Sequence, residues 1–279
     1  MTNPNHEQEE FWSKRGGVTW SENDAIMDAT LAPVLDHLLE IAALQPGERV
    51  LDIGCGTGLS TARAGAAVAP GGHVTGVDIA EQMLVKARAQ YDRDTATFLQ
   101  ADAQSFGFEA AAYHAVISRF GVMFFADPPA AFANIARAVK PGGRMVFMTW
   151  ASAPENPWFS IPRAVATERL GQAEPTPPNA PGPMGLADRD YAMDVFAKAG
   201  LKDVTITPVA LDLTPPGTAQ WMGEFSLVLG PASRIFAELA GTKEDAAAIV
   251  AGVEDRFRAY ETADGLRVPA VLNRIEVRL

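Results

Sequence analysis

The sequence has few of the residues that build disulfide frameworks and metal centres. It contains one cysteine, Cys55, and four histidines among 279 residues. A single cysteine excludes an intrachain disulfide framework and a cysteine-rich metal site. The histidines and acidic residues also show no spacing that is typical of metal ligands. We therefore expect no metal site.

An excess of positive charge is also missing. The chain has 34 acidic and 23 basic residues, which gives a formal net charge of −11. A large negative charge repels phosphate backbones and anionic lipid, and the Lys and Arg residues are scattered rather than clustered. We expect a small molecule as the partner, and neither a nucleic acid nor a membrane.

Long apolar runs are absent too. None approaches the roughly 20 residues that a membrane-spanning helix needs. Residues Met1 to Glu7 contain neither a basic region nor an apolar signal core, which favours a cytoplasmic protein. The length suits one large domain, or one domain with a cap. The oligomeric state stays open.

The most informative segment that is present is an apolar strand followed by a glycine-rich turn. It runs from Val50 to Ser60 and reads VLDIGCGTGLS. A second strand ends in Asp78, about 20 positions later, as in nucleotide-binding α/β units. Only glycine allows so tight a turn beside a ligand, and a carboxylate there can accept the hydroxyls of a ribose. The pattern predicts an adenosine-containing cofactor.

The spacing of the glycines distinguishes between cofactors. Gly54, Gly56 and Gly58 form G-x-G-x-G, whereas a dinucleotide site has G-x-G-x-x-G. With Asp52 in front, the segment resembles motif I of class I S-adenosylmethionine (SAM) methyltransferases. Cys55 is interpreted as a small residue that fits the turn.

Three further segments strengthen this resemblance and follow in the order of the family. The first reads VTGVDI (74–79) and the second FLQADA (98–103). The third reads AVISRFGVMFF (115–125), and it is followed by a helix and then by VKPGGRMVF (139–147). The resemblance is strong over residues 40–150, and 118–125 is similar to the small-molecule methyltransferases of the ubiquinone and menaquinone biosynthesis type.

The resemblance implies a fold and a division of the chain. The expected fold is a doubly wound, Rossmann-like α/β sheet of seven mostly parallel strands, the last one antiparallel, with a helical cap. The chain divides into an N-terminal segment that helps to cap the site (1–45) and a SAM-binding core (46–150). A Pro-rich lid or connector (151–188) follows. The C-terminal part of the sheet (189–279) contains a cap insertion at about 216–262.

Local patterns add detail to the expected elements. Residues 1–20 are polar and read as irregular. A helix is expected after Ser21, which forms an S-x-x-D capping pattern with Asp24, and Pro33 is expected to kink or divide it. The other expected helices span 158–170 and 189–199, with two or three more in 216–262. The expected strands lie near 49–53, 73–78, 95–99, 113–119, 143–150, 204–213 and 268–279.

The candidate site residues cluster at the predicted carboxyl ends of the strands, where open α/β sheets bind ligands. The residues expected to bind the cofactor are Trp20, Asp52, Gly54, Cys55, Gly56, Asp78, Ile79, Met83, Asp102, Ala103, Arg119 and Phe120. Those expected to form the substrate pocket are Trp12, Trp20, Met123 and Trp150. The sequence identifies no catalytic base.

The resemblance implies methyl transfer from SAM to an O, N or C atom of a small molecule by in-line displacement, which yields S-adenosylhomocysteine. Two alternatives remain open. A SAM-binding sensor or partner subunit without catalysis would carry the same motifs. An NAD-dependent oxidoreductase would share the turn and the ribose acid, but its glycines would be spaced differently.

Overall fold

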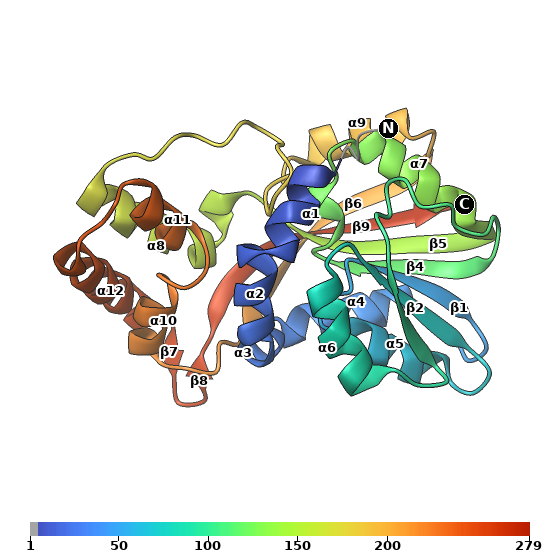
Figure 1. Cartoon of the computed structure of the whole chain (residues 1–279), viewed down its shortest axis with the longest axis horizontal. Helices are drawn as coiled ribbons and strands as arrows, with labels where there is room; N and C mark the ends of the chain where they lie inside the picture. Colours follow the sequence, from blue (N-terminus) through green and yellow to red (C-terminus); the bar gives the residue numbers. More distant parts are fainter. Residues whose placement is uncertain (1–4) are drawn as a thin grey trace.

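A computed structural model describes residues 5–279, so the first four residues of the segment 1–45 lie outside the described part. Seven strands form one sheet in the order β3-β2-β1-β4-β5-β9-β6 (Figure 1). In that order they span Ala96–Gln100, His73–Asp78, Arg49–Ile53, Tyr113–Arg119, Val139–Trp150, Val268–Arg278 and Asp203–Leu213. Strand β9 runs antiparallel to both neighbours, and the other pairs are parallel. The predicted fold is confirmed.

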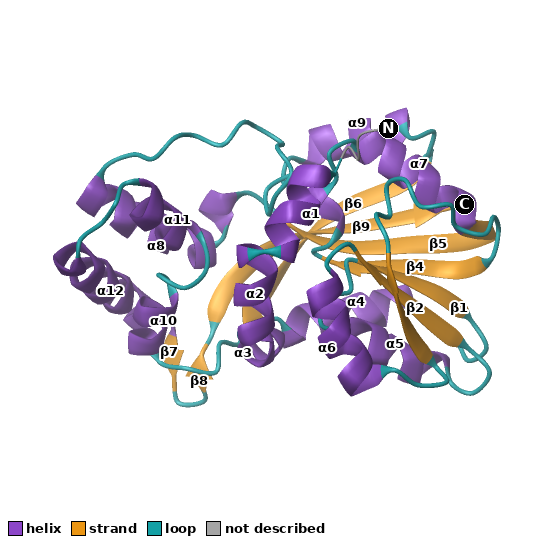
Figure 2. Cartoon of the chain, in the orientation of Figure 1, coloured by secondary structure: helices purple, strands orange, loops and turns teal. Residues whose placement is uncertain are grey.

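Helices cover both faces of the sheet (Figure 2). Adjacent strand residues point to opposite faces, and both faces are apolar, as in buried parallel sheets. Val50 packs in one cluster with Leu35, whereas Leu51 packs in another with Phe132. The first face is covered by α4 (Ala32–Ala42) and α5 (Leu59–Val68), and the second by α7 (Pro128–Ala138) and α9 (Arg189–Lys198), while α6 (Glu81–Tyr91) packs on β3.

The remaining helices form a cap lobe beside the sheet, and β6 and β9 extend towards it (Figure 1). Its elements are α8 (Pro157–Leu170), α10 (Ala219–Phe225), α11 (Pro231–Glu238), α12 (Lys243–Phe257) and the hairpin of β7 (Glu261–Thr262) and β8 (Gly265–Leu266). Trp158 and Leu272 belong to one hydrophobic cluster that runs from the sheet into this lobe. No helix in residues 5–279 is both long and apolar enough to span a membrane.

The N-terminal segment differs from its prediction. The described part of 1–20 is helical rather than irregular, with α1 (His6–Ser13) and α2 (Arg15–Glu22), and α3 (Asp24–Thr30) follows. Ser21 therefore lies inside a helix and does not begin one. These short helices lack a long apolar stripe, so the periodicity that reveals most helices is missing. The chain divides at Leu31, and Pro33 stands in the first turn of α4, where proline is tolerated.

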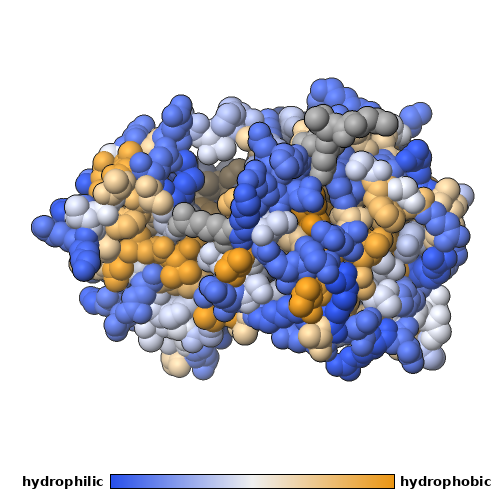
Figure 3. Space-filling model, in the orientation of Figure 1, coloured by the Kyte–Doolittle hydropathy of each residue, from blue (hydrophilic) through white to orange (hydrophobic). Residues whose placement is uncertain are grey.

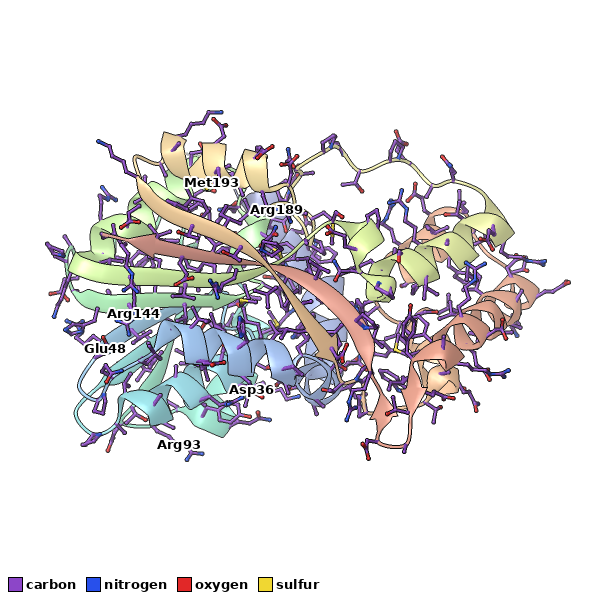
Figure 4. The ribbon with its side chains drawn as sticks, turned by 180° about the vertical axis from the view of Figure 1, so that it is seen from behind. Asp36, Glu48, Arg93, Arg144, Arg189 and Met193 are labelled. Atoms are coloured by element: carbon purple, nitrogen blue, oxygen red, sulfur yellow. The ribbon has the colours of Figure 1, made fainter. Side chains whose placement is uncertain are left out.

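A partly buried ion pair holds the end of the sheet that is remote from the cap. Arg144 on β5 donates two hydrogen bonds to the Glu48 carboxylate, at 2.8 and 2.7 Å, and one to the Ala42 carbonyl at the end of α4. Arg144 and Glu48 lie together at the end of the sheet remote from the cap lobe (Figure 4). This ion pair thus links β5 to the end of α4 and to the residue that precedes β1, at the amino ends of the strands.

Candidate functional site

The glycine-rich turn leaves β1 beside the point where the strand order reverses, between β1 and β4. Gly54 has φ +67°, and a Cβ atom there would lie 2.5 Å from the Cα atom of Gly121, after β4. Only glycine permits both this conformation and this approach of two backbones. Two strands therefore open a crevice at the topological switch point, where doubly wound folds bind ligands.

Asp52 lies beneath the turn instead of in the crevice. Its Oδ2 atom accepts hydrogen bonds from the hydroxyls of Ser60 (2.5 Å) and Thr61 (2.7 Å), on the first turn of α5. The side chain is fully buried, and burial raises its pKa to about 6. Asp52 does not line the cavity described below. The structure shows that its carboxylate ties the turn to α5, and its contact with the cofactor stays a prediction.

Asp78, at the end of β2, faces the same turn from the cavity side. Its Oδ2 atom accepts a hydrogen bond from the Gly56 N–H (2.8 Å), and Oδ1 accepts one from the Ala80 N–H (2.9 Å). Burial raises the pKa of Asp78, while these backbone donors act in the opposite direction. Each oxygen has a further lone pair, so the carboxylate is held in place and can still accept hydrogen bonds from a ligand.

Arg119, at the end of β4, is held by α3. Its Nη2 atom donates to Oδ1 of Asp28 at 2.7 Å, and the two side chains are 11% and 19% exposed. Its Nη1 atom is buried without a hydrogen-bond partner among the described residues, and so is Oδ1 of Asp52. Buried polar atoms normally have partners. Of these two atoms only Arg119 Nη1 belongs to a residue that lines the cavity described below, so it is the one that a polar ligand group could pair with.

The residue after Arg119 is strained. Phe120 has φ +66°, which is uncommon for a residue with a side chain. Its ring stacks on Trp150 at the end of β5, with centroids 4.5 Å apart and an interplanar angle of 6°. Such strain persists only where its surroundings enforce it and is concentrated at functional sites. The stack forms a wall between the crevice and the cap.

All of the predicted site residues except Asp52 line one cavity of about 1140 Å³. A recess opens between the cap lobe and the N-terminal helices in the space-filling view (Figure 3). The cavity also takes in residues that sequence reasoning did not assign to the site. These include Asn5, Phe124, Phe125, Trp158, Phe159, Arg163, Met184, Leu229 and Arg234.

The N-terminal helices close one side of this cavity. Asn5 donates hydrogen bonds to Oδ1 of Asp102 (2.8 Å) and Oε1 of Gln104 (3.2 Å), and it accepts one from the Ala126 N–H (2.7 Å). Helices α1 and α2 run between the sheet and the cap lobe (Figure 1). No motif marks Asn5, and its partner Asp102 is 97 positions away, so the sequence carried no signal for this contact.

Aromatic pairs line the cavity both beneath the cap and beside α1. Phe159 on α8 meets Trp150 edge to face, with centroids 4.9 Å apart, and Trp12 meets Phe124 in the same way at 5.2 Å. Such pairs stabilise packing beyond the area that they bury. The cavity therefore has two ends: a polar one at the strand ends and an apolar one beneath the cap.

Two other chemistries lack support within residues 5–279. No group of three or more His, Cys, Asp or Glu side chains there could hold a metal ion. Cys55 is buried, and burial raises the pKa of its thiol well above the usual value. A neutral thiol is a poor nucleophile, which agrees with the interpretation of Cys55 as a small residue of the turn.

Residues 50–143, which build this turn and the strand ends, match the family described as methyltransferase domain. Residues 50–143 are a SAM-dependent methyltransferase domain. Nocamycin O-methyltransferase of Saccharothrix syringae is 28% identical over 214 residues, 71% of this chain and 76% of that protein. Demethylmenaquinone methyltransferase of Clavibacter sepedonicus is 37% identical over 109 residues, 39% of this chain and 43% of that protein.

A solved structure has the same fold as this methyltransferase. Phosphoethanolamine N-methyltransferase 2 of Haemonchus contortus, in complex with phosphomonomethylethanolamine and S-adenosylhomocysteine, has a TM-score of 0.58 and is 19% identical. The match covers 100% of this chain and 61% of that one. At this identity the likeness shows the fold alone.

SAM is the cofactor of this methyltransferase domain, and the crevice fits it. A Cβ atom at Gly56 would meet nothing closer than the Met83 Cε atom at 4.0 Å, so the space above the turn is open. The Asp78 carboxylate flanks this space, and the Nη1 atom of Arg119, another lining residue, has no hydrogen-bond partner among the described residues. The crevice thus offers surfaces that match the nucleoside, charged and apolar groups of SAM.

Proposed function

We propose that this methyltransferase transfers the methyl group of SAM to a small-molecule acceptor, with S-adenosylhomocysteine as product. The observation that supports this proposal is the single cavity with a polar and an apolar end. Its volume of about 1140 Å³ exceeds the roughly 300–1,000 Å³ of a pocket for one small ligand. It therefore has room for a cofactor and an acceptor together. The relatives named above are, by name, methyltransferases of small organic molecules.

We assign the cofactor to the polar end. Asp78 would accept the ribose hydroxyls, and Ile79 and Met83 would pack on the adenine ring. Asp102 and Ala103 would lie at the adenine amino group. The free Nη1 donor of Arg119 suits the carboxylate of the methionine moiety, because a guanidinium pairs well with a carboxylate. Gly54, Cys55, Gly56, Phe120 and Trp20 would contribute shape.

We assign the acceptor to the apolar end, with Trp12, Trp20, Met123 and Trp150 in its walls. SAM supplies an already activated methyl group, so the chain's own task is to align the acceptor and exclude water. Positioning of this kind can contribute roughly 7–11 kcal/mol, which exceeds the roughly 10²–10⁴-fold effect of a general base. The absence of an identified base is therefore compatible with catalysis.

The segments of the chain receive roles in the same proposal. The core 46–150 holds the cofactor, and 1–45 covers it with α1 and α2. The connector 151–188 and the insertion about 216–262 enclose the acceptor, with the rest of 189–279 completing the sheet. The net charge of −11 speaks against nucleic acid or an anionic membrane as partner, and we propose a cytoplasmic location.

The test is a calorimetric titration of the full chain with SAM, S-adenosylhomocysteine and NAD. We expect micromolar binding of the first two, no binding of NAD, and at least a tenfold loss of affinity in Asp78→Ala, since a charge-assisted hydrogen bond contributes roughly 1.5–3 kcal/mol. Asp203→Ala, exposed at the start of β6, is the control and should bind normally.

Transfer of labelled methyl from SAM to a set of aromatic and polycyclic acceptors then separates the alternatives. Binding of SAM without transfer to any acceptor would favour a non-catalytic SAM-binding subunit. Binding of NAD alone would overturn the methyltransferase proposal.

A further inference from the structure

We propose that the acceptor is an apolar ring compound bearing an acidic group, and that Arg163 on α8 recognises this group. The inference rests on the proposed function, because it concerns the acceptor end of the same cavity. It adds a charge requirement to an acceptor that the family resemblance leaves undefined.

The charged side chains of α8 divide into two sets. Glu168 and Arg169 both reach α12, where Arg256 donates to Glu168 at 2.5 Å and Arg169 donates to Asp245 at 2.6 Å. The Arg163 side chain makes no hydrogen bond or ion pair with any residue in 5–279; it is exposed and belongs to the lining of the cavity. Two charges of this helix thus hold the cap together, while the third is left at the cavity wall.

The other cations on the cavity wall have acidic partners. Arg119 pairs with Asp28, and Arg234 pairs with Glu238 at 2.8 Å. Arg163 is consequently the one basic side chain of the described cavity lining that lacks a counter-charge. A guanidinium without a carboxylate, in a chain of net charge −11, provides a local attraction that the rest of the surface opposes.

The surroundings of Arg163 define the rest of the acceptor. Phe159 precedes it by one helical turn and lines the same cavity, since residues four apart share one face of a helix. Phe159 in turn contacts Trp150, which stacks on Phe120. The guanidinium therefore stands at the border of an aromatic wall. A flat ring system would lie on that wall, and its oxyanion would pair with the planar fork of Arg163.

Two fluorescent probes that differ in one charged group test this arrangement. The anionic probe is 8-anilinonaphthalene-1-sulfonate, and its neutral counterpart is N-phenyl-1-naphthylamine. Both are titrated into the full chain saturated with S-adenosylhomocysteine. We expect the anionic probe to bind more tightly than the neutral one, and Arg163→Gln to weaken the anionic probe about fivefold to tenfold, as for loss of a charged hydrogen bond, with little effect on the neutral one.

Two further variants make the result specific. Arg163→Lys keeps the charge but loses the bidentate fork, so it should retain part of the preference. Arg169→Gln removes an equal charge from the α12 side of the same helix and should leave both probes unchanged. Thermal unfolding of each variant verifies that the cap is intact.

The outcomes separate this inference from the proposed function. If S-adenosylhomocysteine binds but Arg163→Gln leaves the ratio of the two probe affinities unchanged, the acidic acceptor is refuted and the methyltransferase proposal stands. An equal loss in Arg169→Gln would also refute it, because the effect would then reflect net charge. Failure to bind S-adenosylhomocysteine at all would instead overturn the proposed function.

Discussion

The two ends of the cavity are lined by different kinds of chemical group. At the cofactor end, recognition depends on backbone geometry and carboxylates: Gly54 meets Gly121, and Asp78 binds two backbone N–H groups. At the acceptor end, it depends on aromatic side chains, with Phe159 of the cap and Trp150 of β5 in the wall. Backbone geometry constrains a sequence tightly, whereas an apolar wall can be built from many residues. The cofactor end is therefore readable in the sequence in more detail than the acceptor end.

The largest expected effect tests the backbone side of this comparison. Gly54→Ala places a Cβ atom 2.5 Å from the Gly121 Cα atom at a φ of +67°. Strain and overpacking together should lower the free energy of unfolding by about 4 kcal/mol, with loss of cofactor binding. Urea unfolding measures the first effect and calorimetry the second.

Gly107→Ala is the matched control for this variant, because a Cβ atom there has no neighbour within 4 Å. A stable Gly54→Ala variant that binds S-adenosylhomocysteine normally would show that the contact between the two turns is dispensable.

The second effect concerns the buried carboxylate beneath the turn. The pKa of Asp52 is raised from 3.8 to about 6, so the folded state binds this proton more tightly than the unfolded state. Its contribution to stability is fully favourable below about pH 4, declines as the pH rises to about 6, and is constant above. The difference is about 3 kcal/mol at 1.36 kcal/mol per pKa unit.

Asp52→Asn removes this titration. The free energy of unfolding of the variant minus that of the wild type should rise by up to this amount between pH 4 and pH 7, measured by urea unfolding at both values. A difference that is independent of pH would show that Asp52 titrates normally.

A third, smaller effect compares ion pairs of the two lobes. Arg144→Gln in the core removes a bidentate pair whose side chains are 13% and 14% exposed, and should cost about 2 kcal/mol. Arg256→Gln in the cap removes the pair with Glu168, 40% and 62% exposed, and should cost less than about 1 kcal/mol. Thermal unfolding ranks the two, and equal costs would contradict the argument from burial.

The smallest effect should be confined to the acceptor end. Phe159→Leu keeps an apolar side chain but loses the edge-to-face contact with Trp150, which is worth about 0.5–1.5 kcal/mol. Once an acceptor is known, methyl transfer at low acceptor concentration should fall about fivefold, while the affinity for S-adenosylhomocysteine stays the same. A parallel fall in that affinity would mean that the two ends are not separable.

The same contrast explains how far the sequence predicts the structure. The seven strands and the positions of Gly54, Gly56, Asp78 and Arg119 follow from local patterns, because buried parallel strands are continuous apolar runs and the turn between them needs glycine. The antiparallel last strand is expected only from the family resemblance. Asp52 belongs to the same motif but lies on the far side of the turn. Spacing places a residue near a ligand but does not give the side on which its carboxylate lies.

The acceptor end could be read only in part, because the sequence predicts Trp12, Trp20, Met123 and Trp150, which line the cavity, but not the residues of the cap. Arg163 stands among other charged residues of its helix, and at the cofactor end Asn5 meets Asp102 across 97 positions. Their importance arises from which partners they have and lack, and partners are set by tertiary packing. Short helices such as α1 and α2 also escape periodicity, because they are stabilised by docking on the rest of the molecule rather than by their own stripe.

The position of β9 has a consequence for synthesis on the ribosome. This strand, Val268–Arg278, follows the six other strands of the sheet in the sequence and yet lies inside the sheet, between β5 and β6. Proteins are made from the N-terminus, and early parts can fold while later ones are still being translated. Here β6 has no strand to pair with until β9 has been translated and has left the exit tunnel. The nascent chain must therefore wait with β5 as an open edge, a state that chaperones would be expected to shield.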